Sequence, residues 1–335
     1  MKLSYFTLSF FLTALASAKS GTSPDIFKKD KPPSKYDSKK GFFKQSDDST
    51  DETTFDVITE NFGLEDGVTW DQVIKYVNDK NKEHYDDGEA YKLFFLGRHG
   101  EGYHNIAPLE YSTTDWTCYW QIRDGNGNIS WFDAELTDKG IGQAKNLSIA
   151  WQDQLAHNSA PLPQSYYVSP LRRTCQTFNY TWAPITNYSD VEKYAPTVKE
   201  LARETYGIGT ESERHTKSFI HSNWPQFVFE DVFTEADELW TKEQHESKQH
   251  RNYRANVLLN DIFSNDPNTV ISVTTHHGFI NSILKTANHR KFVVGTGQMI
   301  PVVIKASASK KFDTPTLTKP WVEYSSECAT FNPSQ

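Results

Sequence analysis

The chain has 335 residues, of which 14% are aromatic, and it carries a formal net charge of −8. A chain of this length buries a large core, and we expect one domain of about 250 residues with an extension. The negative charge excludes a generally basic surface. A nucleic-acid-binding protein is therefore disfavoured, and any anionic ligand must be held by local positive charge.

The N-terminus has the pattern of a secretory signal peptide. Lys2 supplies the positive start, residues 3–15 form the apolar stretch, and the small residues 16–18 form a cleavage site. A membrane anchor is the alternative, but the apolar stretch is shorter than the roughly 20 residues that span a bilayer. We expect residues 1–18 to be removed and the protein to be secreted, extracellular or in the cell wall, without membrane attachment.

A polar leader and a helix are expected to precede the catalytic region. Residues 19–54 are rich in Lys, Ser, Asp and Pro, which predicts a disordered leader. Residues 55–335 are predicted to form one domain with an N-terminal helical extension. Apolar residues at helical spacing predict a helix over 69–82, capped by Thr69 and packed on the domain as a lid.

Sequons and cysteines agree with a secretory route. Four Asn-x-Ser/Thr sequons predict glycosylation, at Asn128, Asn146, Asn179 and Asn187. The three cysteines allow one disulfide and one remaining thiol. We favour a pair between Cys118 and Cys328, because Cys175 follows a strand-to-turn motif and is expected to pack inside as a small hydrophobic residue.

From residue 92 onward, short apolar stretches alternate with longer amphipathic ones. We expect helices over residues 136–156, 170–178 and 279–287. The expected strands are residues 93–96, 166–168, 198–201, 270–274 and 300–304. This alternation predicts an α/β fold, a three-layer sandwich with a mostly parallel central sheet flanked by helices.

Three of the expected strands end in residues suited to binding phosphate. Residues 97–100 read Gly-Arg-His-Gly, residues 275–278 read Thr-His-His-Gly, and the strand at 166–168 leads into a turn with two arginines. The planar fork of arginine fits a tetrahedral oxyanion, and glycines let backbone N–H groups approach it. The converging strand ends therefore predict a phosphate-binding pocket at one edge of the sheet.

The spacing of Arg98-His99-Gly100, with Asn105 six residues after the His, resembles the signature of the histidine phosphatase superfamily. Further segments resemble its other motifs in order: LTDKGIGQA at 136–144, SPLRRTCQT at 169–177, ETYG at 204–207 and HHG at 276–278. The resemblance is to the phosphoglycerate mutase-like branch, and within it to a fungal group of mutase-like phosphatases. It implies the α/β fold already expected.

The resemblance also implies a role for each site residue. His99 is the expected nucleophile, which becomes a phosphohistidine, and Glu204 is the expected general acid and base. Four residues are expected to hold the phosphoryl oxygens: Arg98, Asn105, Arg173 and His277. No cofactor or metal is implied, and the expected activity is that of a secreted, acid phosphatase-like enzyme that hydrolyses small phosphate monoesters.

Two other functions remain open. A phosphoglycerate mutase-type isomerase is disfavoured, because Thr205 stands where the mutases have an arginine that holds a substrate carboxylate. A catalytically silent binding module on the same fold is disfavoured, because the catalytic set is intact. A zinc site is disfavoured, because His276 and His277 would point to opposite faces of a strand.

Some polar residues have more than one reading. Arg172, one position off the motif, is expected in a surface salt bridge. His104 either lines the substrate mouth or packs the loop. Residues 235–254 predict a solvated amphipathic helix, from which His245 or Arg254 could reach the pocket.

Overall fold

The computed structural model of the chain describes residues 33–84, 86–186, 190–308, 321–323 and 328. The predicted signal peptide, residues 19–32 of the predicted leader and the sequon at Asn187 lie outside the described residues.

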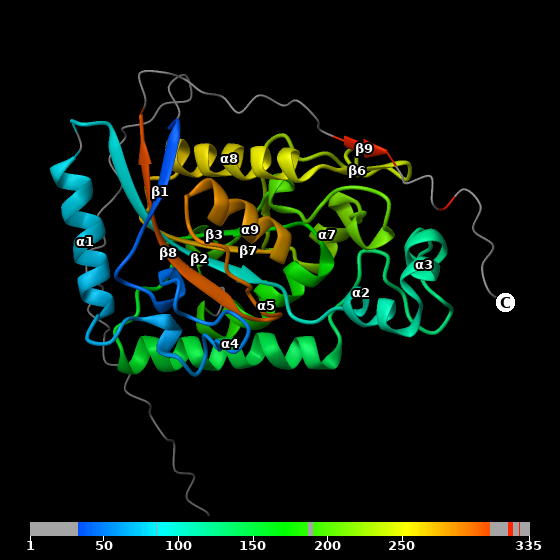
Figure 1. Cartoon of the computed structure of the whole chain (residues 1–335), viewed down its shortest axis with the longest axis horizontal. Coiled ribbons are helices and arrows are strands. Elements are labelled where there is room, and N and C mark those ends of the chain that lie inside the picture. The colour runs from blue at the N-terminus through cyan, green and yellow to red at the C-terminus, as the bar shows by residue number, and fades with distance from the viewer. Residues whose placement is uncertain (1–32, 85, 187–189, 309–320, 324–327, 329–335) are drawn as a thin grey trace, which may run out of the picture.

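A central sheet of seven strands in the order β1-β8-β2-β7-β3-β4-β5 organises the fold (Figure 1). Its strands are β1 (Lys35–Lys39), β2 (Glu89–Arg98), β3 (Ser165–Val168), β4 (Thr197–Val198), β5 (Val228–Phe229), β7 (Val270–Thr275) and β8 (Met299–Ser307). The pairs β2–β7, β7–β3, β3–β4 and β4–β5 are parallel, whereas β8 runs antiparallel to β1 and β2. The predicted α/β fold with a mostly parallel sheet is confirmed.

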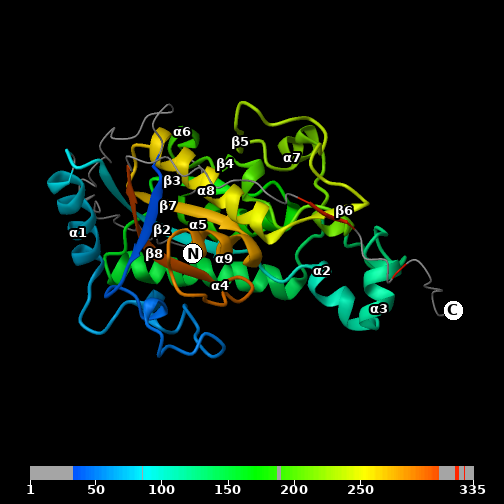
Figure 2. The ribbon, with the colours of Figure 1, turned by 45° about the horizontal axis from the view of Figure 1, so that its top comes forward.

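Helices cover both faces of the sheet (Figures 1 and 2). One face packs against α1 (Trp70–Glu83), α4 (Asp138–His157) and α5 (Arg172–Thr186), and the other against α8 (Lys248–Asn265) and α9 (His277–Thr286). Strand β2 serves both cores, because alternate residues of a strand point to opposite faces. Leu93 and Phe95 belong to one core, and Phe94 and Leu96 to the other.

Shorter elements complete the described chain. They are the helices α2 (Tyr103–Ile106), α3 (Thr113–Asp115), α6 (Val191–Tyr194) and α7 (Lys217–Asn223), the strands β6 (Gln244–Glu246) and β9 (Trp321–Glu323), a π-helical turn at Trp116–Trp120, and 3₁₀ turns at Lys44–Ser46, Asn61–Gly63, Ala107–Glu110, Glu200–Ala202 and Thr210–Ser212. The strand predicted over 198–201 is shorter than expected, since the chain turns after Val198. No helix in the described part of the chain has the length and apolar character needed to cross a membrane.

The prediction of a disordered leader is wrong for residues 33–54. Strand β1 adds an edge to the sheet by pairing with β8, and Tyr36 packs into one core with 2% of its surface exposed. Phe43, which is 1% exposed, packs into the other core. A few aromatic residues anchor this segment while its charged residues face solvent, so its average composition conceals its buried positions.

The predicted helix at 69–82 is α1, and it begins as the sequence indicated. Thr69 Oγ1 accepts a hydrogen bond from Gln72 N (3.3 Å), and Gln72 Oε1 accepts one from Thr69 N (2.9 Å), which forms a capping box. The helix packs on the domain, but it does not act as a lid over the predicted site. Asn81 hydrogen-bonds to the backbone of Tyr91, near the start of β2, whereas the site residues follow the end of that strand.

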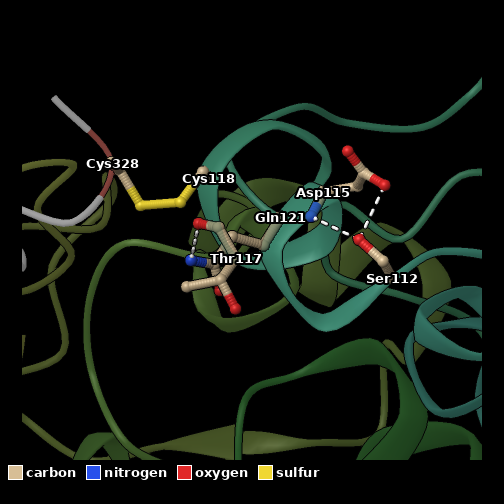
Figure 3. The surroundings of a disulfide bond; sticks show 6 residues. All are labelled: Ser112, Asp115, Thr117, Cys118, Gln121 and Cys328. Carbon is tan, nitrogen blue, oxygen red and sulfur yellow. Dashed lines mark hydrogen bonds between the residues drawn. A yellow bond between two sulfur atoms is a disulfide. The ribbon is translucent and has the colours of Figure 1, made fainter. Parts of the chain in front are cut away.

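The predicted Cys118–Cys328 disulfide is present, and Cys175 is a buried free thiol. The disulfide joins positions 210 residues apart, and it lies beside Thr117 and Gln121 (Figure 3). Strand β9, a few residues before Cys328, pairs antiparallel with β6. Together these two links fix C-terminal residues against the part of the molecule that carries the predicted site.

The helix predicted over 235–254 is wrong in its first half. Residues 244–246 form β6, and α8 begins only after Ser247, whose hydroxyl accepts from His250 N (3.1 Å). The preceding loop is held by buried charge: Asp237 pairs with the fully buried Arg203 and accepts a hydrogen bond from Arg214 N. Buried ion pairs of this kind leave little trace in hydrophobic periodicity.

Candidate active site

The site residues expected from the sequence meet in one cavity of about 540 Å³ at the carboxyl edge of the sheet. The cavity wall contains all six of them: Arg98, His99, Asn105, Arg173, Glu204 and His277. They come from the end of β2, from α2, from the start of α5, from the segment after β4 and from the start of α9. Residues up to 179 positions apart thus share one pocket, as expected of strand ends in an α/β sheet.

The loop after β2 is held by close packing against the start of α4. A Cβ on Gly100 would lie 2.4 Å from the carbonyl oxygen of Gly140, and one on Gly140 would lie 2.0 Å from that of Glu101. Thr137 caps α4 through Gly140 N (3.1 Å), and its own N–H donates to the carbonyl of Glu101 (2.9 Å). The motif that opens α4 therefore fixes the backbone that carries His99.

The motif that opens α5 supports the same loop from the other side. Thr177 Oγ1 accepts a hydrogen bond from Gly100 N (2.9 Å) and donates one to the carbonyl of Arg173 (2.7 Å). Ser169 Oγ hydrogen-bonds to Nε2 of His276 (2.8 Å), which ties the end of β3 to the end of β7. These contacts explain the residue types of the motif without giving Thr177 or Ser169 a chemical role.

His99 is oriented for nucleophilic attack. Its Nδ1 lies 2.7 Å from the carbonyl oxygen of Gly100, and a carbonyl only accepts, so Nδ1 carries the proton and Nε2 keeps the lone pair. The residue is 3% exposed. Burial, followed by the charges of Arg173 and Arg98, lowers the pKa of His99 well below its ordinary value. The imidazole is therefore neutral in mildly acidic solution.

Two arginines share the cavity wall with His99, the fully buried Arg173 and the half-buried Arg98. Arg98 Nη1 donates to the carbonyl of Val294 (2.9 Å), and Arg173 Nη1 donates to the carbonyl of Glu211 (2.7 Å). The Nε atoms of both arginines are buried and have no hydrogen-bond partner among the described residues. Buried donors are normally paired, so these two suit a ligand with several acceptor oxygens.

Three further histidines surround this centre. The rings of His104 and His276 each lie 5.1 Å from that of His99, measured between centroids. His276 is fully buried and His104 is half-buried. Burial and the nearby Arg173 lower the pKa of both imidazoles well below the ordinary value. His277 is half-buried in the cavity wall, and its Nδ1 has no hydrogen-bond partner among the described residues. Of the adjacent pair, only His277 lines the cavity.

Glu204 lies at the start of α9. Its Oε2 accepts from Gly278 N (2.9 Å), and its Oε1 accepts from Thr205 N (3.0 Å) and lies 3.4 Å from Arg251 Nη1. A Cβ on residue 278 would lie 2.3 Å from Glu204 Oε1, so a larger residue here would displace the carboxylate. The helix N-terminus and these donors fix the carboxylate toward the cavity.

Arg254 holds the backbone of Glu204 but does not line the cavity. Its guanidinium donates to the carbonyls of Arg203 (3.0 Å) and Glu204 (2.9 Å), and it forms a buried ion pair with Glu246. His245, the other residue considered in this run, does line the cavity. Arg172 pairs with Glu135 and lies outside the cavity wall, in agreement with the salt-bridge reading.

Sequence reasoning missed Glu211, a second carboxyl group in the cavity wall. Its Oε2 is buried without a hydrogen-bond partner among the described residues, and burial raises the pKa of Glu211. The residue lies in a 3₁₀ turn without periodicity, so only its closeness to the ETYG motif could have suggested it. Thr117, Gln121 and Cys328 also line the cavity, brought there by the disulfide-linked segments.

The other sequence predictions have mixed outcomes. Among the described residues, no three His, Cys, Asp or Glu side chains are grouped as ligands for a metal ion. Of the predicted glycosylation sites that the structure describes, Asn128 and Asn146 are exposed and Asn179 is half-buried. Their modification stays a prediction.

With this geometry established, comparison with known proteins identifies the class. The model of the histidine phosphatase superfamily (branch 1) matches residues 94–294, and the chain belongs to this family. The segment therefore includes all the expected site residues.

Curated relatives place the chain more narrowly, in the phosphoglycerate mutase-like branch. Phosphomutase-like protein 3 of Candida albicans is 45% identical over 81% of this chain and 80% of its own length. A probable phosphoglycerate mutase of Arthroderma benhamiae is 40% identical over 82% of this chain and 85% of its own. Among solved structures, Mycobacterial hydrolase 1 overlaps with a TM-score of 0.39 at 16% identity, over 66% of this chain and 98% of its own.

Proposed function

We propose that this protein is a secreted phosphatase that hydrolyses small phosphate monoesters through a phosphohistidine on His99. The observation that carries the proposal is the oriented His99 in one cavity with Arg98 and Arg173, whose buried Nε donors have no partner among the described residues. This arrangement suits a tetrahedral dianion. Secretion rests on the signal-like N-terminus, which lies outside the described residues.

In the first step, Nε2 of His99 attacks phosphorus while the bond between phosphorus and the ester oxygen breaks. Arg98, Arg173 and His277 offset the negative charge on the transferring group. Glu204 donates a proton to the leaving oxygen, because an alkoxide leaves poorly without one. The product alcohol departs and the phosphoryl group remains on His99.

In the second step, Glu204 takes a proton from water, and the water oxygen attacks the phosphohistidine. The bond between phosphorus and nitrogen breaks, which releases inorganic phosphate and restores neutral His99. The chain's own residues supply every proton and charge that these two reaction steps use.

Mutase chemistry is the second candidate, favoured by the name of the Arthroderma relative, a probable phosphoglycerate mutase. A mutase needs a cation for the substrate carboxylate, and Thr205 stands at that position. Arg251 does reach Thr205 Oγ1 (2.7 Å), but it also donates to Ser282 Oγ (3.2 Å) and does not line the cavity. Among the described residues, no Arg or Lys other than Arg98 and Arg173 lines this wall, which supports hydrolysis over isomerisation.

The test is an assay of the purified secreted protein on two substrates. We expect phosphate release from p-nitrophenyl phosphate and an acid-labile, base-stable phosphoryl group on the quenched enzyme, absent in His99→Ala. Interconversion of 2- and 3-phosphoglycerate without phosphate release would instead establish the mutase. Absence of both activities would identify a catalytically silent binding module.

A further inference from the structure

A second cavity, of about 590 Å³, lies between α8 and α9 outside the catalytic pocket. The two helices lie side by side in both views (Figures 1 and 2). The cavity shares no lining residue with the catalytic pocket. Its volume is in the range of pockets that hold small molecules, about 300–1,000 Å³.

The wall of this cavity is cationic, although the whole chain has a net charge of −8. Arg251, Lys248, Lys285 and Lys291 line it, together with asparagines, a serine and His289, and no Asp or Glu does. The three lysines are exposed and form no ion pair with a residue that the structure describes. The three lysines repel each other across one concave surface, and an anion between them would relieve this repulsion.

Two of these cations, Lys248 and Arg251, also lie at the start of α8. A helix N-terminus favours negative charge, yet the first turn of α8 contains Lys248 and no acid, and Arg251 follows one turn later. Cations at this end of an 18-residue helix oppose its dipole. They are consistent with an anion that both the side chains and the helix terminus stabilise.

Two contacts join residues of this cavity to residues of the catalytic pocket. Arg251, which lines the second cavity, lies 3.4 Å from Glu204 in the first. Asn281, which also lines the second cavity, contacts Nε2 of His277 at 2.9 Å. An anion bound in the second cavity would therefore contact Arg251 and Asn281, which in turn contact Glu204 and His277.

We propose that the cavity between α8 and α9 is a second anion-binding site, which takes a ligand bearing phosphate groups. The lysines and Arg251 supply the charge, and the asparagines and Ser282 supply neutral donors. The ligand is either a free phosphate compound or a further phosphate group of a substrate held in the catalytic pocket. This site goes beyond the proposed hydrolysis and does not require it.

The test measures binding without turnover. Tripolyphosphate is titrated calorimetrically into the full-length His99→Ala protein at physiological ionic strength, and we expect two ions bound per chain. Adding Lys285→Gln and Lys291→Gln is expected to weaken one of the two sites by at least about tenfold. The matched control is Lys75→Gln with Lys82→Gln, exposed lysines of α1 that remove the same charge far from the cavity.

Each outcome decides the proposal. Two sites in the parent and in the control, with one weakened in the Lys285/Lys291 variant, support it. Binding in the Lys285/Lys291 variant that is unchanged from the parent, or an equal loss in the control, would overturn it. The source of the ligand follows from kinetics on the active enzyme. If Lys285→Gln with Lys291→Gln raises KM only for a bisphosphate, the substrate extends into the second cavity. If the same variant instead responds less to added inorganic phosphate in its rate, the second cavity binds a free phosphate compound.

Discussion

His99 combines three properties that a phosphoryl-accepting nucleophile needs: a fixed tautomer, a lowered pKa and a cavity that it shares with two arginines. Its backbone is held independently of its ring, through His99 N to the carbonyl of Thr275 (3.0 Å). The chemistry of the site therefore depends on the imidazole, whereas the backbone geometry of the loop does not depend on it.

Replacing His99 with Ala should remove turnover and leave the fold intact. We expect phosphate release to fall by at least about a thousandfold, because no other group in the cavity can take its covalent role. The control is far-ultraviolet circular dichroism with thermal melting of the same sample. A variant that keeps a tenth of the wild-type rate would rule out His99 as the nucleophile.

The pH dependence of the rate should reflect the two arginines. Since the pKa of His99 is lowered, the acid limb of kcat/KM should lie well below about pH 6.5, the ordinary value for imidazole. Arg98→Gln removes one of the charges that lower it, so the limb should move to higher pH. Arg98→Lys keeps the charge but loses the fork, so the rate should fall while the limb stays in place. A limb that moves equally in both variants would contradict this account.

Two carboxyl groups compete for the role of general acid, and the leaving group separates them. If Glu204 is the acid, Glu204→Gln should slow an alkyl phosphate by about 10²–10⁴-fold and an aryl phosphate much less, since a phenolate leaves readily. Glu211→Gln is the matched variant, and it should slow both substrates by a similar, smaller factor. The reverse pattern would assign the proton to Glu211, whose pKa burial raises.

At the scale of elements, the sequence was sufficient to predict a helix start where a local motif fixes the backbone contacts there. The residues that open α4 and α5 were recognisable because each fixes a contact that the loop of His99 requires, as Gly140 and Thr177 do. The folded part of the leader was not recognisable, because Tyr36 and Phe43 pair with residues far along the chain. Glu211 was missed for the same reason, since tertiary burial gives it its properties.

Two glycines in the first turns of α4 give a matched test of that packing. A Cβ at Gly140 would lie 2.0 Å from the carbonyl oxygen of Glu101, whereas one at Gly142 would meet no atom within 4 Å. Gly140→Ala should therefore cost about 1–3 kcal/mol and lower kcat, because the backbone of the catalytic loop must shift. Gly142→Ala should raise stability by up to about 1 kcal/mol at unchanged kcat. Urea unfolding and steady-state kinetics measure both, and equal effects would refute the close-packing explanation.

At the scale of the whole molecule, the phosphate pocket places several neutral imidazoles in the interior of an acidic protein. His99 and His276 are buried and His104 is half-buried beside them, and the pKa of each is lowered by burial and by Arg173. The histidines in and behind the candidate site therefore link folding to pH.

That linkage predicts the pH at which the fold weakens. Because the pKa of each imidazole is lower in the folded chain than in the unfolded one, only the unfolded chain takes up these protons just below about pH 6.5. Stability should be full above that pH and should fall as the pH drops toward the folded-state values, by up to about 1.4 kcal/mol per pH unit for each imidazole. His276→Asn tests one of the three without removing a proposed catalytic group, and asparagine suits the N-cap position that residue 276 occupies in α9. Urea unfolding at pH 7 and pH 5.5 should give a smaller loss of stability for His276→Asn than for the wild-type chain. Equal losses would mean that His276 takes up its proton in the folded state, and that the interior tolerates the charge.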